Sequence, residues 1–265
     1  MSIKVAINDL AQSARLTKYW LYSAFIRLQI EHKRTFLSVL WEPLTVFFVA
    51  ATLSLVWSQI LVVEDLFDYF FYILVGFSVW SLLIAKLINR AVASLSNRSF
   101  ELTTSAKPIC LLPLEEIAYS FLNFFTTAPF LLALSIYYYG FSFSAIGLFF
   151  LGLLLTWITA LGLCLTLGVF AFFYRDVMQI IRAVMRLGFL VTPIIWKPER
   201  LGEYEKYVWF NPFYSYIDFC RAPLMGQAPH PNSVFIAFGL SISLILLGFI
   251  VLSMAGKGVR RRVFS

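Results

Sequence analysis

The sequence predicts an all-α integral membrane protein with six transmembrane helices, an N-terminal amphipathic interface helix, and external re-entrant helices between spans five and six. Two observations predict this class. First, 60% of the residues are hydrophobic, only 13% are charged, and the mean hydropathy is +0.82. A soluble domain of this size needs more charged side chains to cover its surface. Second, long apolar runs alternate with short polar segments, as in chains that cross a membrane repeatedly.

We expect a single membrane domain, because no polar stretch is long enough to bury a hydrophobic core of its own. Residues 1–36 are expected to form the cytoplasmic interface helix, residues 37–255 the six spans, and residues 256–265 a basic cytoplasmic tail. A cytoplasmic loop at 94–113 and an external segment at 197–232 interrupt the spans. The N-terminus lacks the apolar core and small-residue cleavage site of a signal peptide.

The N-terminal segment is basic and amphipathic. Its apolar positions recur at helical spacing, and they are Trp20, Leu21, Ala24, Phe25 and Leu28. A helix of this kind lies in the plane of the membrane interface, with its apolar face among the lipid headgroups. A second interpretation stays open, in which the polar side of the helix also docks a cytoplasmic partner.

The first two spans are predicted at residues 37–60 and 69–93. Pro43 falls in the first turn of span one, where proline does not break a helix. Lys86 and Arg90 lie four residues apart near the end of span two, so their side chains can reach the cytoplasmic headgroups. The polar loop that follows has room for one short helix between residues 97 and 104. It is either a plain loop or a contact element.

Spans three and four are predicted at residues 114–139 and 143–173. Pro129 lies inside span three and predicts a kink. Span four exceeds the ~20 residues that a bilayer requires, so tilt or protrusion is expected. Small residues recur at every fourth position of span four and predict close helix packing, at Gly152, Thr156, Ala160 and Cys164.

The fifth apolar run, residues 177–196, carries Arg182 and Arg186 on one helix face. At ~1.5 Å rise per residue, Arg186 lies about 14 Å from the start of the run. An arginine near the bilayer centre costs at least ~2.5 kcal/mol. Either both arginines reach the cytoplasmic headgroups and only set the topology, or they face a polar interior and bind the phosphates of a substrate.

The segment after the fifth run is polar and aromatic, and it is broken by Pro193, Pro198 and Pro212. We expect short amphipathic helices at the outer membrane face, with aromatic anchors at Trp196, Trp209, Phe210 and Tyr214. Asp218 and Arg221 lie three residues apart and are candidates for an ion pair. Passive interfacial packing is the competing interpretation. The last span is predicted at residues 234–255.

The distribution of basic residues orients the chain. With both termini in the cytoplasm, 17 of the 21 Lys and Arg residues lie inside, and only Lys197, Arg200, Lys206 and Arg221 lie outside. This asymmetry follows the positive-inside rule. It also accounts for the net charge of +7, so we do not expect nucleic acid as a partner.

The sequence contains no motif for catalysis or for ATP hydrolysis. A glycine-rich phosphate loop, a G-x-S-x-G nucleophile elbow, an H-E-x-x-H pair and a Cys/His cluster with metal spacing are all absent from it. Glu115 and Glu116 are interpreted as ordinary acids at a helix start. Carboxylates suited to ion coupling are absent from the span centres. We therefore expect a transport subunit rather than an enzyme, with no cofactor of its own, driven by a partner.

Five local motifs resemble those of a known family. They are WEPL (41–44), AKPICLLPLE (106–115), YRDVMQI (174–180), TPIIWKPERLG (192–202) and NPFYSYIDFCRAPLMGQ (211–227). Together with six spans and a basic N-terminal helix, these motifs resemble the type 2 ABC exporter membrane subunits of the polysaccharide-export permease family. The O-antigen exporter permeases of lipopolysaccharide transport show the greatest resemblance. It covers nearly the whole chain, and TPIIW followed by NPF and RAPLMG is its most specific part.

The resemblance implies a homodimer in the bacterial inner membrane, with two cytoplasmic ABC ATPase subunits that hold the ATP and Mg. The substrate would be a polysaccharide on undecaprenyl diphosphate, and membrane lipids would surround the dimer. Capsule or teichoic-acid export, export of a small hydrophobic compound or drug, and a non-transporting scaffold remain as alternatives.

The same resemblance suggests roles for individual residues. Substrate binding is expected at Arg182, Arg186, Trp196 and Tyr214. Contact with the ATPase is expected at Trp20, Arg98, Phe100, Glu101, Arg175 and Asp176. The external helices are expected to gate the exit through Pro193, Asn211, Pro212, Asp218 and Arg221.

Overall fold

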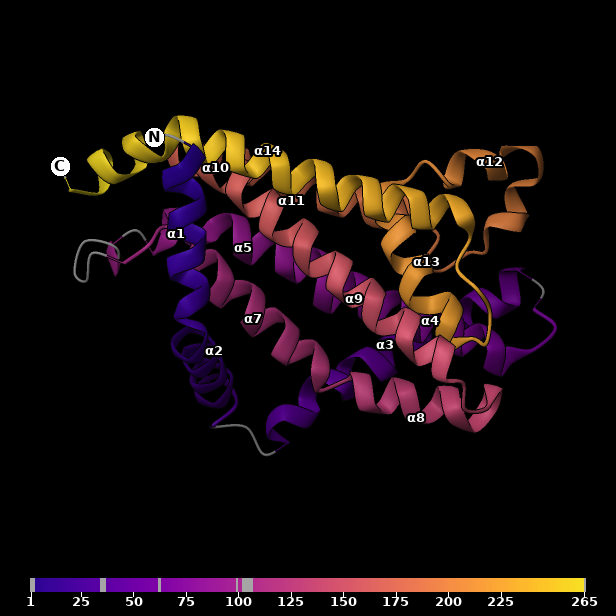
Figure 1. The fold of residues 1–265 in the computed structure, drawn as a ribbon. Coiled ribbons are helices and arrows are strands. Elements are labelled where there is room, and N and C mark those ends of the chain that lie inside the picture. Colours follow the sequence, from indigo (N-terminus) through magenta and orange to yellow (C-terminus); the bar gives the residue numbers. More distant parts are fainter. Residues whose placement is uncertain (1–2, 34–36, 62, 99, 102–106, 265) are drawn as a thin grey trace.

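A computed structural model describes residues 3–33, 37–61, 63–98, 100–101 and 107–264, and every regular element within these ranges is helical (Figure 1). The all-α prediction is therefore confirmed. Among the described residues, four helices are long and apolar enough to cross a membrane: Trp41–Leu61, Leu66–Asn97, Phe143–Phe173 and Pro231–Gly256. A bent pair, Leu111–Phe125 and Ala128–Tyr139, makes a fifth if it counts as one span. The protein is thus a candidate multi-pass membrane protein.

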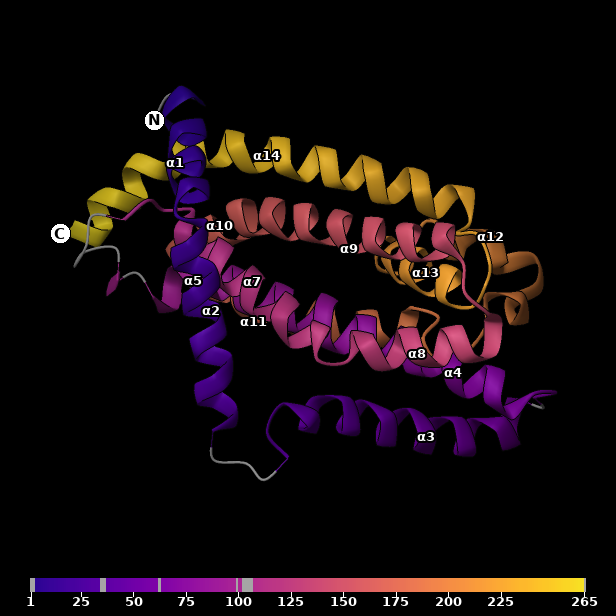
Figure 2. The same ribbon diagram turned by 60° about the horizontal axis from the view of Figure 1, so that its bottom comes forward.

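Two helices at the N-terminus, α1 (Ile3–Arg15) and α2 (Thr17–His32), run across the end of the bundle at which both chain termini lie (Figures 1 and 2). The single interface helix predicted for residues 1–36 is thus two helices, and residues 34–36 lie outside the described ranges. The buried face of α2 repeats every four residues, at Trp20, Ala24, Leu28 and His32. Leu21 and Phe25, predicted on that face, are 40% and 46% exposed.

Helix α3 (Trp41–Leu61) lies at one edge of the bundle beside α4 (Leu66–Ser78), as Figure 2 shows. Pro43 sits in the first turn of α3, as predicted. Helix α4 continues through a π-helical segment, Val79–Ala85, into α5 (Lys86–Asn97). Lys86 Nζ donates to Glu42 Oε1 over 2.6 Å and ties α5 to α3, so this lysine pairs within the bundle.

The loop after α5 is described only in part. Arg98, Phe100 and Glu101 are described, but most of the short helix predicted between residues 97 and 104 lies outside the described residues. The chain then forms α7 (Leu111–Phe125) and α8 (Ala128–Tyr139), which meet at a bend of 41°. The bend lies directly before Pro129, so the predicted kink in this span is confirmed.

Helix α9 (Phe143–Leu163), a π-helical segment (Cys164–Gly168) and α10 (Val169–Phe173) form one long helix, as predicted for span four. The four small residues of its predicted ridge are all buried. Gly162, which the ridge prediction omitted, marks the tightest approach to α14 (Pro231–Phe264). A Cβ atom there would lie 2.5 Å from the backbone carbon of Leu244. Close packing of α9 against α14 therefore depends on this glycine.

The fifth run departs from the prediction. Helix α11 (Asp176–Val191) has 16 residues, and at ~1.5 Å per residue it spans about 24 Å, less than the ~30 Å hydrocarbon core of a bilayer. It carries two arginines and is not among the helices that qualify as membrane spans. The prediction of six spans is therefore confirmed only in part.

The external segment forms a 3₁₀ helix (Pro198–Tyr204), α12 (Glu205–Val208) and α13 (Pro212–Leu224) at the end of the bundle opposite the termini (Figure 1). Every residue of α13 from Tyr214 to Leu224 is buried, because the helix packs against α9, α14 and α4. Helix α13 therefore lies inside the bundle, which corrects the expectation of an amphipathic helix with one exposed face.

Helix α14 runs without a break through residues 256–264, so the predicted separate tail is a helical extension. The side chains of its basic residues, Lys257, Arg260, Arg261 and Arg262, lie outside the described residues.

Candidate functional site

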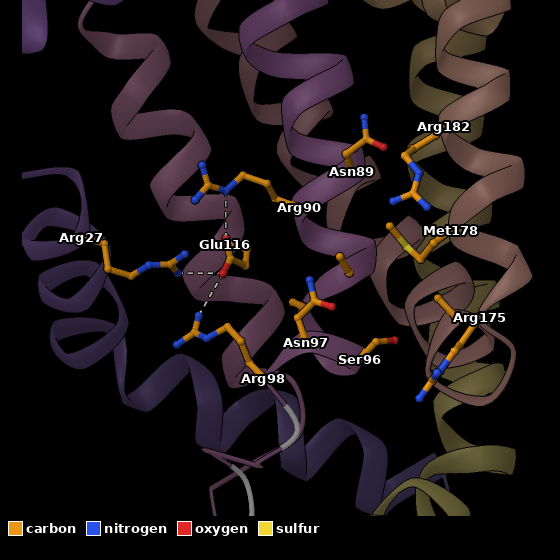
Figure 3. Close-up of a pocket in the computed structure, with 13 residues that line it drawn as sticks. Arg27, Asn89, Arg90, Ser96, Asn97, Arg98, Glu116, Arg175, Met178 and Arg182 are labelled. Atoms are coloured by element: carbon orange, nitrogen blue, oxygen red, sulfur yellow. Dashed lines mark hydrogen bonds and ion pairs between the residues drawn. The ribbon is translucent and has the colours of Figure 1, made fainter. Parts of the chain in front are cut away.

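A cavity of about 840 Å³ opens among α2, α5, α7, α10 and α11. Five of the charged side chains that line it are arginines and one is a glutamate: Arg27, Arg90, Arg98, Arg175, Arg182 and Glu116. Figure 3 shows that Arg27, Arg90 and Arg98 converge on Glu116, whereas Arg175 and Arg182 come from the opposite side. The side chains that line the cavity therefore carry more positive than negative charge, which favours an anionic ligand.

One wall of the cavity is a network of partly exposed arginines and buried carboxylates. Glu115 and Glu116, on α7, have side chains that are only 1% and 5% exposed. Arg27 Nη1 donates to Glu116 Oε1 over 2.7 Å and to Glu115 Oε1 over 3.2 Å. Arg98 Nη1 donates to Glu116 Oε1 over 3.0 Å, and its Nη2 lies 2.9 Å from Glu115 Oε1. These contacts join α2 and the end of α5 to α7.

Contacts made by Arg90 and by Asp9 hold this network in place. Arg90 Nε lies 3.4 Å from Glu116 Oε2, and its guanidinium lies 4.0 Å from the centroid of the Tyr119 ring. Asp9 of α1 accepts hydrogen bonds from the backbone N–H groups of Ile109 and Cys110, at 3.2 and 2.9 Å. These N–H groups precede the first turn of α7 and have no partner within that helix, so α1 fixes the helix start that carries the carboxylates.

The charges of the network reinforce one another. Burial opposes the positive charge of Arg98, but its hydrogen bonds to Glu101 and Glu115 outweigh burial and raise its pKa above the usual value. Burial likewise opposes the charge of Arg27, whose pKa is raised by Glu116. Hydrogen bonding from Arg98 lowers the pKa of Glu101 below its ordinary 4.5. Arg27, Arg98 and Glu101 are therefore all charged at neutral pH.

The other wall belongs to α11 and carries cations without carboxylate partners. Arg175 and Arg182 are exposed, and no ion pair joins either of them to a described residue. Arg182 also lines a second cavity of about 670 Å³, together with the aromatic rings of Phe77, Trp80 and Phe189. Asn89 and Arg182 line both cavities, so a cationic chamber adjoins an aromatic one along α5 and α11.

The structure brings together only half of the residues predicted to bind substrate. Arg182 and Arg186 both line the aromatic cavity. Trp196 and Tyr214 line neither of the two cavities. The Trp196 carbonyl accepts a hydrogen bond from Tyr72 at 3.0 Å, and the Tyr214 ring packs on Trp209 with centroids 5.3 Å apart. A single site does not contain all four.

The residues predicted to contact an ATPase also differ in exposure. Phe100 is 77% exposed, and Arg175 and Asp176 are exposed at the start of α11. Trp20 is only 9% exposed, and its ring nitrogen donates to the Ser13 carbonyl over 3.1 Å, so it holds α2 to α1 instead of facing outward. Arg98 and Glu101 pair with each other at 2.6 Å. Trp20 is therefore poorly placed for direct contact with a partner.

The predicted gate residues gather around the break after α11. Asn211 caps α13 by accepting hydrogen bonds from the N–H groups of Phe213 and Tyr214, and its amide nitrogen donates to Thr192 Oγ1 over 3.0 Å. Pro212 occupies the first turn of α13, where its fixed φ fits a helix. Asn211 thereby links the start of α13 to the end of the broken fifth run.

The predicted ion pair between Asp218 and Arg221 is not formed. Arg221 Nη1 donates to the Pro193 carbonyl over 3.1 Å, and its guanidinium lies 3.6 Å from the centroid of the Tyr72 ring. Asp218 instead accepts a hydrogen bond from the backbone N–H of His230 at 2.9 Å. The two residues lie three positions apart on α13, but their side chains contact different neighbours.

Sequence reasoning missed the Glu115–Glu116 pair as a site, because adjacent acids at a helix start are common. Its arginine partners lie up to 89 positions away, and no local pattern indicates such pairings. No group of three His, Cys, Asp or Glu side chains that could hold a metal ion occurs among the described residues.

No protein-family model and no curated protein matches this chain.

Proposed function

We propose that this chain is the membrane subunit of an ATP-driven ABC exporter that moves a lipid-linked polysaccharide across the bacterial inner membrane. The proposed substrate is a glycan of the O-antigen kind carried on undecaprenyl diphosphate. The observation that carries the proposal is the arginine-lined cavity of about 840 Å³ that adjoins an aromatic cavity along the same helices. The resemblance of five sequence motifs to the polysaccharide-export permeases supports it.

The chemistry of the two cavities fits the two parts of such a substrate. Arginine presents a planar fork of N–H donors that matches phosphate oxygens, so Arg175 and Arg182 are suited to a diphosphate headgroup. Aromatic rings offer flat apolar faces to sugars, and Phe77, Trp80 and Phe189 provide such faces. A ligand with a phosphorylated end and a glycan needs both surfaces next to each other.

A homodimer accounts for the short fifth run. Arg182 and Arg186 are exposed on α11, and an arginine facing lipid near the bilayer centre is costly. A second copy of the chain would turn this face toward a shared polar channel, so that the arginines of α11 need not face lipid. Two ATPase subunits, carrying ATP and Mg, would dock at the end of the bundle near Phe100 and Asp176, which the positive-inside rule assigns to the cytoplasm.

The competing account is that Arg182 and Arg186 only reach cytoplasmic headgroups and set the topology. Substitution separates the two accounts. Lysine keeps the positive charge and satisfies a topological role, but it loses the forked donor geometry. Glutamine loses both. Arg15, exposed at the end of α1 and outside both cavities, offers a matched control for loss of one arginine.

The test is ATP hydrolysis by the purified complex of this chain and its ATPase in proteoliposomes, with and without lipid-linked glycan. We expect the glycan to stimulate hydrolysis in the wild type and in Arg15→Gln, and stimulation to be lost in Arg182→Gln and reduced in Arg182→Lys. Stimulation by a hydrophobic drug but not by any lipid-linked glycan would reject the proposal in favour of small-molecule export. Normal stimulation in Arg182→Gln would remove this arginine from the site.

A further inference from the structure

Glu116 occupies an unusual position in the cavity wall. Its Oε1 atom accepts hydrogen bonds from Arg27 and Arg98, whereas its buried Oε2 atom has no hydrogen-bond partner and lies 3.4 Å from Arg90 Nε. The residue is only 4% exposed, yet it is the one acidic side chain among the described residues that line the cavity. A carboxylate among three guanidinium groups has the arrangement that arginines also adopt around a phosphate.

The surrounding charge leaves room for a stronger anion. Five arginines face the cavity, and two of them, Arg175 and Arg182, form no ion pair with a described carboxylate. A carboxylate brings one negative charge and two oxygens to this site. A diphosphate brings more charge and more acceptor oxygens, so it can satisfy arginines of both walls at once.

We propose that Glu116 is a resident counter-ion, which a diphosphate headgroup displaces from Arg27, Arg90 and Arg98 when it enters the cavity. This inference rests on the proposed function, because it takes the ligand to be a lipid-linked diphosphate. The exchange replaces the bridge from Arg27 to Glu116 by a bridge from Arg27 to the ligand, and leaves the 3.2 Å contact of Arg27 with Glu115 as its remaining ion pair with α7. Occupancy of the cavity therefore changes how α2 is held against α7.

A resident counter-ion has a measurable consequence. The site is open to ligand only in the fraction of molecules in which Glu116 has left the arginines, so the apparent affinity is reduced by that fraction. Neutralising Glu116 removes the internal competitor and should strengthen binding. If Glu116 were only a brace that positions the arginines, its neutralisation should weaken binding instead.

The experiment uses the full-length chain in nanodiscs of phosphatidylcholine, with farnesyl diphosphate as the probe and farnesol as the uncharged comparison. We expect Glu116→Gln to bind farnesyl diphosphate roughly tenfold more tightly than the wild type, a change of about 1.4 kcal/mol. Glu101→Gln is the matched control, because Glu101 also pairs with Arg98 but does not line the cavity. It should leave the affinity nearly unchanged, and Arg182→Gln should weaken it.

Several results would overturn the inference. Unchanged or weaker binding by folded Glu116→Gln would make Glu116 a brace, and an equal gain in Glu101→Gln would reduce the effect to general electrostatics. Inorganic pyrophosphate binding as tightly as farnesyl diphosphate would assign the site to a soluble anion. Equal binding of farnesol and farnesyl diphosphate would remove the phosphate site.

A second measurement covers the case in which Glu116→Gln does not fold. Hydrogen exchange of wild-type α2 around Ser23–Leu28 should accelerate with farnesyl diphosphate and not with farnesol, because the bridge from Arg27 to Glu116, the shorter of its two bridges to α7, is broken. An unchanged exchange rate at saturating ligand would contradict displacement. Glycan-stimulated ATP hydrolysis by the wild-type complex tests the proposed function separately, so export can stand even where displacement fails.

Discussion

Arginines that are wholly or partly shielded from solvent occur in two regions of the molecule, and their partners differ between the two. At the end where the termini lie, Arg27 and Arg98 are paired with the carboxylates of Glu115 and Glu116 beside an open cavity. Near the opposite end, Arg221 is 2% exposed and is held by a backbone carbonyl and the rings of Tyr72 and Tyr214. No ion pair joins Arg221 to a carboxylate among the described residues.

The difference indicates different uses of the same side chain. An arginine paired with a carboxylate beside a cavity can exchange that partner for another anion. An arginine enclosed by aromatic rings has no such alternative, and its hydrogen bond to Pro193 satisfies a carbonyl at the break after α11. Tyr72 also donates to this carbonyl, and Tyr69 donates to the Ile195 carbonyl, so side chains replace the missing helical bonds there. We therefore regard Arg221 as structural and the cavity arginines as exchangeable.

The largest effect on stability is expected at Arg221. Arg221→Met should lower the free energy of unfolding by about 3 kcal/mol, because the Pro193 carbonyl loses a charged hydrogen bond and the cation–π contact disappears. Thermal unfolding in detergent measures this loss, and Lys206→Met, at an exposed position on α12, is the control. If Arg221→Met lowers the free energy of unfolding no more than the control does, the packing around the break after α11 does not depend on Arg221.

A smaller effect is expected at Arg98, and it should be repairable. Arg98→Gln leaves the buried carboxylates of Glu115 and Glu116 with fewer cations, and we expect a loss of about 2 kcal/mol. Adding Glu116→Gln should restore part of the stability, since one of the uncompensated charges is then removed. Around Tyr72, adding Asp218→Asn to Arg221→Gln should restore less, because no ion pair joins these two residues. If the second substitution restores equal stability in both double variants, Arg98 and Arg221 do not differ in their dependence on a carboxylate.

Tyr72→Phe tests what the Tyr72 hydroxyl contributes at the break after α11. The substitution keeps the ring under Arg221 but removes the hydroxyl that donates to the Pro193 and Trp196 carbonyls at 3.3 and 3.0 Å. We expect a loss of about 1 kcal/mol in the free energy of unfolding. Hydrogen exchange should rise locally after α11 and stay unchanged in α2. A uniform rise through the molecule would mean that Tyr72 supports the whole bundle rather than the break.

Much of the fold could be predicted from the sequence, because local chemistry determines it. Apolar length predicts α3, the α9–α10 helix and α14, and Pro129 predicts the bend between α7 and α8. The burial of α13 could not be predicted in this way. Its tyrosines and phenylalanines fit an interface as well as a core, and the packing of α9 and α14 around it decides between them.

The candidate site was predictable to a lesser extent. Arg182 and Arg186 stand out because charged residues in an apolar run are costly. The three arginines around Glu116 come from α2 and α5, and the glutamate comes from α7, so their meeting depends on tertiary packing. The Asp218–Arg221 spacing permits an ion pair, but Tyr72 and His230 provide competing partners from other parts of the chain. Spacing along one helix carries no information about those partners.

The smallest expected effect is a pH dependence of the stability that Glu101 contributes. Hydrogen bonding from Arg98 lowers the pKa of Glu101 below 4.5 in the folded state, so its contribution to stability is present above pH 4.5 and is lost as the pH falls through the lowered value. The Glu101 side chain is 38% exposed, so solvent screening limits this contribution to a few tenths of a kcal/mol.

We expect wild type and Glu101→Gln to differ slightly in unfolding temperature at pH 7 and to converge as the pH falls below 4.5. The loss caused by Arg221→Met should change little over the same range, since no ion pair joins this arginine to a described carboxylate. A Glu101→Gln difference that does not change with pH would mean that this side chain acts through packing rather than through its charge.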